Sequence, residues 1–209
     1  MTHDYGFPVT ATARIPLPEP AQMTPEQLAI HRAMVKGPRG RMVGPMRAVV
    51  HSPELADRWQ KFGELVRYRM VLPEELKELA ILACGRHWNS DVEWAVHRNA
   101  AEKAGVSADV IAAIEAAKLV CFARLEDREV YEFTRLLLRH GQVPDDAYAA
   151  IRSRWGDRGV VELTAIVGYY SMVAMMVNVH LVPVPPEDAP GIHPLGPVRT
   201  ELAESELTA

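Results

Sequence analysis

Helix start and stop signals recur along the whole chain, whereas the alternation of apolar and polar residues that marks a β-strand is rare. The stretch Thr24–Gln27 is a capping box with proline at the first helical position. Gly105 and Gly141 each follow a helical pattern, at the place where a left-handed C-cap is expected. These signals predict an all-α chain of about eight helices.

Capping residues and apolar spacing together give approximate bounds for these helices. The segment 37–45, rich in glycine and arginine, is expected to be a flexible basic loop. We expect helices at residues 25–36, 53–69, 91–104, 126–140, 144–154 and 160–180, and two more that begin at Pro73 and Ser107.

Scattered prolines set both ends of the chain apart from the helical part. Residues 1–22 are predicted to be an extended N-terminal arm, and residues 23–180 a single helical domain. Residues 181–209 form a proline-rich C-terminal tail that cannot be helical throughout. We expect this tail to be loose or to wrap a neighbouring subunit.

The composition is that of an ordinary soluble globular protein. Of its 209 residues, 48% are hydrophobic and 24% are charged, and the formal net charge is −4. This charge gives no general attraction to nucleic acid, so no nucleic-acid partner is expected. Polar residues interrupt the apolar stretch 160–184, which favours a buried helix over a membrane span. Residues 1–16 lack the pattern of a secretory signal, and we expect a cytoplasmic protein with no membrane partner.

Four polar residues around the turn at 88–90 are candidates for a functional site. Ser90, Glu93 and His97 share one face of the helix that follows this turn. Glu78 lies near the start of the preceding helix, so in an antiparallel hairpin it can meet His97. A carboxylate beside an imidazole favours the charged imidazole, which can then donate a proton.

Each of these residues also has a purely structural interpretation. Glu93 and His97 could form an exposed i, i+4 pair worth roughly 0.2–0.5 kcal/mol. Glu78 could complement the dipole of its own helix. A metal site would need a further ligand such as His87, which the turn is expected to direct elsewhere, and we expect no metal.

The spacing of these residues resembles the alkylhydroperoxidase D superfamily and, within it, the carboxymuconolactone decarboxylase family. The redox branch carries Glu, then eleven residues, then CxxCxxxH; here Ser90, Glu93 and His97 follow Glu78 at the same spacing. The resemblance covers roughly residues 14–186, with its quoted segments HSPELADRWQKFGELVRYR, LPEELKELAILACGRHWNSDVEWAVHRNAAEKAGV and RGVVELTAIVGYYSMVAMMVNV. It implies an AhpD-like helical bundle of the non-redox branch, which lacks the CxxC pair.

Ser90 and Glu93 stand where the redox branch has its two cysteines, and this excludes the chemistry of that branch. Thiol-dependent peroxide reduction needs an activated thiol and a resolving partner. The chain's two cysteines, Cys84 and Cys121, form no CxxC motif, zinc pattern or disulfide framework. We expect both to be core residues and do not expect a thiol peroxidase.

The resemblance implies a lyase that decarboxylates a small carboxylated lactone or a related acid, without a cofactor. In that interpretation His97 moves the proton, Glu93 sets the charge of His97, and Glu78 is the second acid or base. The partner is then a small carboxylated molecule. Another proton-transfer reaction at the same residues, isomerisation or lactone hydrolysis, is an alternative. A non-catalytic oligomeric binding protein is the alternative from another class.

Ser90, Trp94 and His51 are candidate substrate-binding residues. A core or interface role is the alternative for Trp94, and a helix-end role for His51. Arg86 would suit a carboxylate anchor, although it could equally be a surface residue. The superfamily resemblance, the methionines and the long apolar helix favour a homo-oligomer, a trimer or a hexamer.

Overall fold

The computed structural model describes residues 12–42, 44–186, 188 and 195, and this part of the chain is helical with no strand. The predicted all-α class is therefore confirmed. The elements, in chain order, are η1 (Pro20–Gln22), α1 (Pro25–Lys36), α2 (Gly44–Val49), α3 (Pro53–Tyr68), α4 (Glu74–His87), α5 (Asp91–Ala104), α6 (Ala108–Glu115), α7 (Leu125–His140) and α8 (Asp145–His180).

The predicted helix ends are mostly those of the structure. The Thr24 side chain accepts a hydrogen bond from the Gln27 amide, and the Gln27 side chain caps in return, which is the predicted capping box. Gly105 and Gly141 both adopt left-handed backbone at the ends of α5 and α7.

Two features differ from the expected helices. Residues 44–49 form the short helix α2, which was not predicted and which begins within the loop expected at residues 37–45. The helix begins with Gly-Pro, a dipeptide that usually indicates a turn. Five of its six residues are buried, so packing against the core stabilises it. The helices expected at 144–154 and 160–180 follow each other in α8 with a sharp bend at Gly156, which has φ 66° and ψ −172°.

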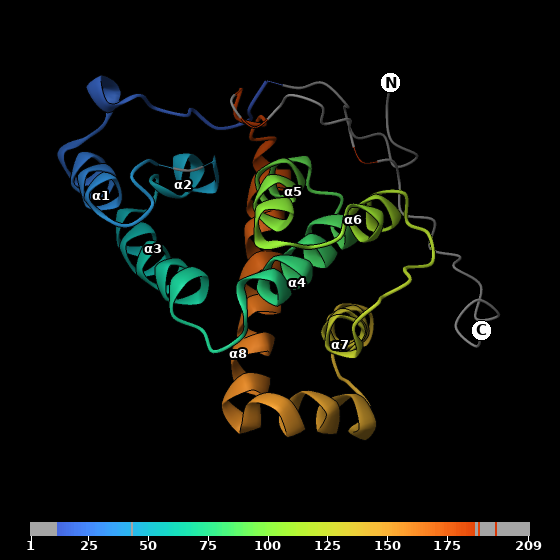
Figure 1. Ribbon diagram of the computed structural model, residues 1–209. Coiled ribbons are helices and arrows are strands. Elements are labelled where there is room, and N and C mark those ends of the chain that lie inside the picture. Colours follow the sequence, from blue (N-terminus) through green and yellow to red (C-terminus); the bar gives the residue numbers. More distant parts are fainter. Residues whose placement is uncertain (1–11, 43, 187, 189–194, 196–209) are drawn as a thin grey trace.

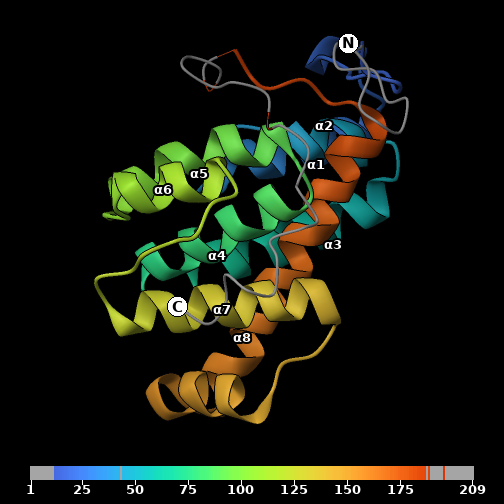
Figure 2. The same ribbon diagram turned by 90° about the vertical axis from the view of Figure 1, so that its right-hand side faces the viewer.

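The helices form two groups on either side of the long upright part of α8 (Figure 1). Helices α1 to α3 lie on one side and α4 to α7 on the other. Figure 2 shows α5 and α6 above α4, with α7 below it. The main apolar core joins α1, α2, α3, α4, α7 and α8, and a second one joins α4, α5 and α6.

Helix α8 is long and apolar enough, by length and composition, to cross a membrane. Half of its most apolar stretch is buried inside the bundle, however, which is the pattern of a core helix. The Asn178 side chain, near its end, donates a hydrogen bond to the Trp88 carbonyl at 2.8 Å. This contact ties α8 to the turn between α4 and α5.

Much of the C-terminal tail lies outside the described residues, so the expectation for it stays a prediction. Among those described, the backbone amide of Leu195 donates to the Asp91 carboxylate at 2.8 Å, and Leu195 packs into the second core. The N-terminal arm is described from residue 12, and the amide of Arg14 donates to the His180 carbonyl at 2.8 Å.

Candidate active site

The hairpin of α4 and α5 brings Glu78 and His97 together. His97 Nδ1 lies 2.7 Å from Glu78 Oε2, so the contact predicted from the sequence is present. The turn between the helices places Asn89 in left-handed backbone with φ 47°, and the Ser90 amide donates to the Gly85 carbonyl at 2.9 Å. Both side chains are buried, with 1% of Glu78 and 6% of His97 exposed.

Glu93 lies one turn before His97 and completes a triangle of buried ionisable groups. Its Oε2 is 3.7 Å from His97 Nε2, which is too long for a direct hydrogen bond. Among the described residues, Glu93 Oε2 and the buried Ser90 hydroxyl, one turn earlier, have no hydrogen-bond partner. Both atoms thus have hydrogen-bonding capacity that the described part of the chain does not use. The interpretation of Glu93 and His97 as an exposed pair does not hold, because both are about 95% buried.

Arg67 and Tyr170 complete the site, and neither was found from the sequence. The Arg67 guanidinium lies 3.3 Å from Glu78 Oε1 and is hydrogen-bonded to the Tyr170 hydroxyl. The Tyr170 ring stands edge-on to the His97 ring, with centroids 4.9 Å apart. The sequence signal for Arg67 is its place on α3: it continues the buried stripe of that helix, where a charged residue needs a partner.

The two carboxyl groups have opposite electrostatic environments. Burial would raise the pKa of Glu78, but the attraction and hydrogen bond of His97, with the charges of Arg67 and Lys77, outweigh it and lower that pKa. Burial also raises the pKa of Glu93, and there the charges of His97 and Arg67 do not offset it. The negative charge of Glu78 adds to this increase.

These environments assign the protons of the site. Glu78 is the carboxylate and can only accept a hydrogen bond, so its short 2.7 Å contact favours the proton on Nδ1 of His97. The Arg67 Nη1 lies 3.3 Å from the same nitrogen and, being a donor only, cannot hydrogen-bond to it in that tautomer. The other nitrogen, Nε2, then faces Glu93 and can take up or release a proton. Burial raises the pKa of the Tyr170 hydroxyl, so Tyr170 stays a neutral phenol.

The sequence and the fold of this chain are similar to known proteins around this site. Residues 53–125, which hold Arg67, Glu78, Glu93 and His97, match the carboxymuconolactone decarboxylase family. No protein of curated description gives a significant match.

Two solved structures share the fold of this protein. One is the alkylhydroperoxidase AhpD core of an uncharacterized peroxidase-related protein from Ralstonia eutropha JMP134, with a TM-score of 0.71 and 15% identity over 86% of this chain and 96% of that one. The other is a cysteine-to-alanine variant of the debrominase Bmp8 in complex with 2,3,4-tribromopyrrole, with a TM-score of 0.66 and 13% identity over 85% of this chain and 94% of that one. The predicted AhpD-like fold is thereby confirmed.

The two cysteines of the chain lie in different environments. Cys84 is buried in the main core, its thiol 3.9 Å from the Val167 carbonyl, and burial raises its pKa strongly. Cys121 is exposed, which corrects the expectation that it is a core residue. The described residues contain no cluster of three His, Cys, Asp or Glu side chains that could hold a metal ion.

The other candidate residues lie outside the triangle of Glu78, Glu93 and His97. Trp94 is fully buried in the second core, and its Nε1 lies 3.3 Å from a Glu115 carboxylate oxygen. His51 is exposed, and its Nε2 lies 2.7 Å from the Pro16 carbonyl, where it contacts the N-terminal arm. Neither is positioned to bind a substrate at His97.

Arg86 and His87 also have structural surroundings. The Arg86 Nε donates to the Glu115 carbonyl at 3.0 Å, and its Nη1 donates to the Asn89 side chain. Arg86 therefore connects α4, α6 and the turn between α4 and α5. The arginine that contacts Glu78 in the candidate active site is Arg67. The His87 ring stands edge-on to the Trp88 ring, with centroids 4.9 Å apart.

A second group of polar residues borders the site on the side of α3. Arg39, in the loop after α1, donates to the Gln60 carbonyl at 3.2 Å and hydrogen-bonds the Tyr169 hydroxyl. The Trp59 indole donates to the same hydroxyl at 3.0 Å. A side chain at Gly63 would collide with both the Tyr169 hydroxyl and the Arg39 guanidinium. The close approach of these groups therefore requires glycine at that position of α3.

Proposed function

We propose that this protein is a cofactor-free lyase that removes carbon dioxide from a small carboxylated lactone or a related acid. The observation that carries the proposal is the pair of carboxyl groups whose pKa values shift in opposite directions around one buried imidazole. Such pairs are typical of acid/base sites, in which one group holds a charge and the other holds a proton. The match of residues 53–125 to the carboxymuconolactone decarboxylase family supports the same reaction class.

The substrate carboxylate is expected to bind near Arg67. The Arg67 side chain is the most exposed member of the site, at 24%, against 6% or less for Glu78, Glu93 and His97. A carboxylate that enters from solvent therefore meets this guanidinium first, and arginine binds carboxylates through two parallel hydrogen bonds. The Ser90 hydroxyl and Glu93 are available for the polar groups of the ring.

The reaction needs one broken bond and one proton transfer. The bond between the ring carbon and the carboxylate carbon breaks, and carbon dioxide leaves. The electron pair of that bond moves into the conjugated lactone, which becomes a dienolate. A proton from Nε2 of His97 then forms the new carbon–hydrogen bond, and solvent returns the proton to His97. The substrate supplies its own electron sink, so the step needs no cofactor.

The geometry supports a different division of roles between the two carboxyl groups than the sequence suggested. Glu78, ionised and bonded to Nδ1, holds the imidazole in place and stabilises its positive charge. Glu93, which lies beside Nε2 with a raised pKa, is the group that can share the transferred proton. Glu78 is thus proposed as the positioning carboxylate, with Glu93 and His97 as the acid/base pair.

The test is carbon dioxide release from 4-carboxymuconolactone by the wild type and by folded His97→Gln and Glu93→Gln variants. General acid/base catalysis contributes about 10²–10⁴-fold, so we expect His97→Gln to lower kcat at least about 100-fold. His140→Gln is the matched control, because His140 is exposed at the end of α7, and it should leave the rate unchanged.

The outcomes separate the alternatives. Absence of carbon dioxide release with a hydrolysed or isomerised product would contradict the decarboxylase and favour another proton-transfer reaction. No turnover of any lactone acid would favour a binding protein. Unchanged release in His97→Gln would contradict the proposed acid/base role.

A further inference from the structure

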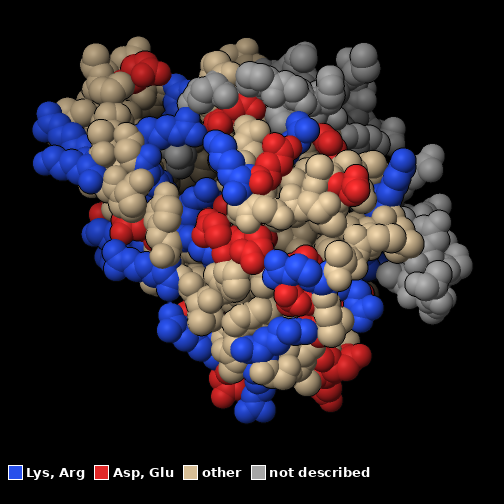
Figure 3. Space-filling model, viewed as in Figure 1, with Lys and Arg blue, Asp and Glu red and all other residues tan. Residues whose placement is uncertain are grey.

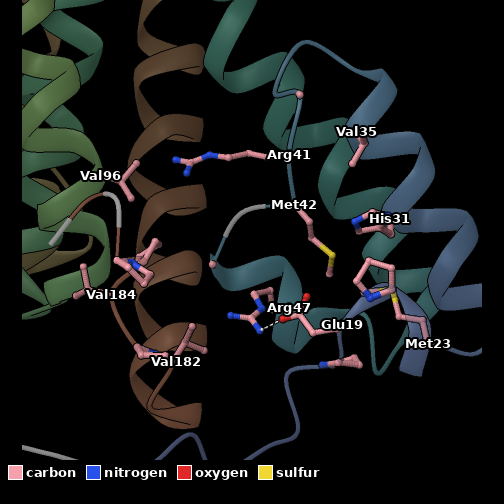
Figure 4. Close-up of a pocket in the computed structure, with 17 residues that line it drawn as sticks. Glu19, Met23, His31, Val35, Arg41, Met42, Arg47, Val96, Val182 and Val184 are labelled. Carbon is pink, nitrogen blue, oxygen red and sulfur yellow. Dashed lines mark hydrogen bonds and ion pairs between the residues drawn. The ribbon is translucent and has the colours of Figure 1, made fainter.

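A cavity of about 380 Å³ lies beside α5, on a face of this helix next to the face that carries Glu93 and His97. It is bounded by the N-terminal arm, α1, the loop before α2, α5 and residues 182–186 (Figure 4). In the space-filling view, Lys and Arg side chains border a hollow on the face between α2 and α5 (Figure 3). The volume is at the low end of the range of small-molecule sites, about 300–1,000 Å³.

Helix α5 separates this cavity from the active site. Val96, which lines the cavity, is the residue before His97 and therefore points about 100° away from it around the helix. Val92, one turn earlier on that face, packs with Ala48 and Val182 beside the cavity. Glu93 and His97 occupy the neighbouring face, toward α4.

The cavity combines apolar walls with two arginines. Met42, Val96, Val182 and Val184 supply apolar surface. Figure 4 shows the guanidinium groups of Arg41 and Arg47 extending in the same direction, with His31 on the opposite wall formed by α1. An apolar chamber with a few convergent polar groups is the usual form of a small-molecule site.

Both arginines already bind carboxylates that belong to the ends of the chain. Arg47 Nη2 lies 3.0 Å from a Glu19 carboxylate oxygen in the N-terminal arm. Arg41 Nη2 lies 3.2 Å from a carboxylate oxygen of Asp188, beyond the last helix. Glu19, which itself lines the cavity, thus shows that the Arg47 guanidinium can be reached by a carboxylate from that side, and Asp188 shows that Arg41 also accepts a carboxylate partner.

Of the two ion pairs, the one between Arg47 and Glu19 is weak enough for a ligand to replace. In the pair with Arg47 the Glu19 side chain is 71% exposed and Arg47 34%, whereas in the pair with Arg41 the Asp188 side chain is 15% exposed and Arg41 45%. Exposed pairs of this kind contribute little to stability, because water screens them and two side chains must be ordered. A ligand that also buries apolar surface in the cavity can therefore displace one of these carboxylates.

We propose that this cavity is a second ligand site, which binds a small organic anion: a carboxylate or sulfonate on an apolar ring or chain. Arg41 and Arg47 bind the anionic group, and the valines and Met42 contact the apolar body. Glu19 and Asp188 compete for the same guanidinium groups when the ligand is absent. The proposal does not rest on the reaction proposed for His97.

The test is a fluorescence titration of the full chain with 8-anilinonaphthalene-1-sulfonate, an apolar molecule with one negative charge. We expect the double variant Arg41→Gln, Arg47→Gln to bind the probe about tenfold more weakly than the wild type. Glu19→Gln should bind it about two- to threefold more tightly, because a competing carboxylate is removed. The control is Arg58→Gln on α3, since Arg58 also forms an ion pair with a glutamate, at 75% and 83% exposure, and lies outside the cavity.

Each outcome supports or contradicts the site. Weaker binding in the double variant together with tighter binding in Glu19→Gln, at unchanged thermal stability, supports it. Equal affinity in the wild type and these variants would contradict it, as would no saturable binding by the folded wild type. Loss of affinity in Arg58→Gln to the same extent would show a general charge effect and would also contradict the site.

Discussion

Glu78 and Glu93 illustrate how position decides the chemistry of one residue type. Both are buried glutamates within reach of the same imidazole, but Glu78 also has Arg67 at 3.3 Å and Glu93 Oε2 has no hydrogen-bond partner in the described part of the chain. Positive charge and a short hydrogen bond keep Glu78 ionised, while burial favours the protonated form of Glu93. The direction of each pKa shift has a consequence for stability.

Glu93→Gln is expected to stabilise the fold near neutral pH. The pKa of Glu93 is higher in the folded state than in the unfolded state. The contribution of Glu93 to stability is therefore complete below its unfolded-state pKa, near 4.3, and is lost as the pH rises through its folded-state pKa. The free energy of unfolding of the variant should therefore exceed that of the wild type by about 1 kcal/mol at pH 8. This difference should shrink below about pH 5. Urea denaturation at both pH values measures this, and an equal difference at both would contradict the raised pKa.

Glu78→Gln is expected to have the opposite effect. The folded-state pKa of Glu78 is lowered, so its contribution is present above the unfolded value and is lost as pH falls through the folded value. The variant leaves His97 and Arg67 without their counter-charge, so its free energy of unfolding should fall by about 2–3 kcal/mol at pH 7. This loss is smaller than that expected on breaking a fully buried ion pair, because Arg67 is partly exposed. The loss should diminish in acid, as denaturation at pH 3–4 would show, whereas a constant loss would point to packing alone.

At this scale the sequence identified the pairs set by helix spacing but not those set by tertiary packing. Glu78 and His97 could be paired because a hairpin fixes which positions meet. Arg67 and Tyr170 come from α3 and α8, whose placement depends on the whole core. His51 shows the reverse error: a polar residue before a helix looked available, and it contacts the arm instead.

Among the elements, α8 depends on the backbone of Gly156. With φ 66° and ψ −172°, this residue is in a region that is essentially restricted to glycine, and the helix changes direction there (Figure 1). The sequence predicted two helices around this point, at residues 144–154 and 160–180, with Asp157, Arg158 and Gly159 before the second. It could not predict α2, since a helix of six residues is stabilised by burial rather than by its own propensity.

Gly156→Ala is expected to destabilise the protein by about 1–3 kcal/mol, because alanine is strained at that backbone conformation. Gly168→Ala, within the same helix, is the matched control. An added Cβ at Gly168 meets nothing within 4 Å, so this variant should be stabilised by about 0.5–1 kcal/mol. Thermal melting curves compare the two, and a neutral Gly156→Ala would contradict the requirement for glycine at the bend.

At the scale of the whole molecule, α8 leaves an uncharged stripe exposed on its upright part. Its members are three or four residues apart and are all exposed: Val161, Thr164, Gly168, Met172, Met175 and Val179. Four of the six are large apolar residues, and apolar side chains exposed along one face are typical of a protein–protein contact. We therefore propose that this stripe contacts a second copy of the chain, in keeping with the homo-oligomer expected from the sequence.

Met175→Lys is expected to weaken that association, because a charge is then placed in the apolar contact. Tyr148→Lys is the control: Tyr148 is also an exposed apolar residue of α8, but it lies before the bend at Gly156. Sedimentation velocity should give a wild type and a Tyr148→Lys variant heavier than the 23.2 kDa monomer, and a lighter Met175→Lys variant. A monomeric wild type would contradict the proposed contact.

The central claim is that Glu93 and His97 transfer protons to and from carbon in a bound lactone. The most direct test is hydrogen exchange in D₂O, followed by ¹H NMR at the carbon next to the carbonyl of the enol-lactone product, with the wild type and folded His97→Gln. We predict exchange catalysed by the wild type and slowed at least about 100-fold in the variant. Equal exchange by both proteins, or none above the uncatalysed rate with the wild type, would contradict the account.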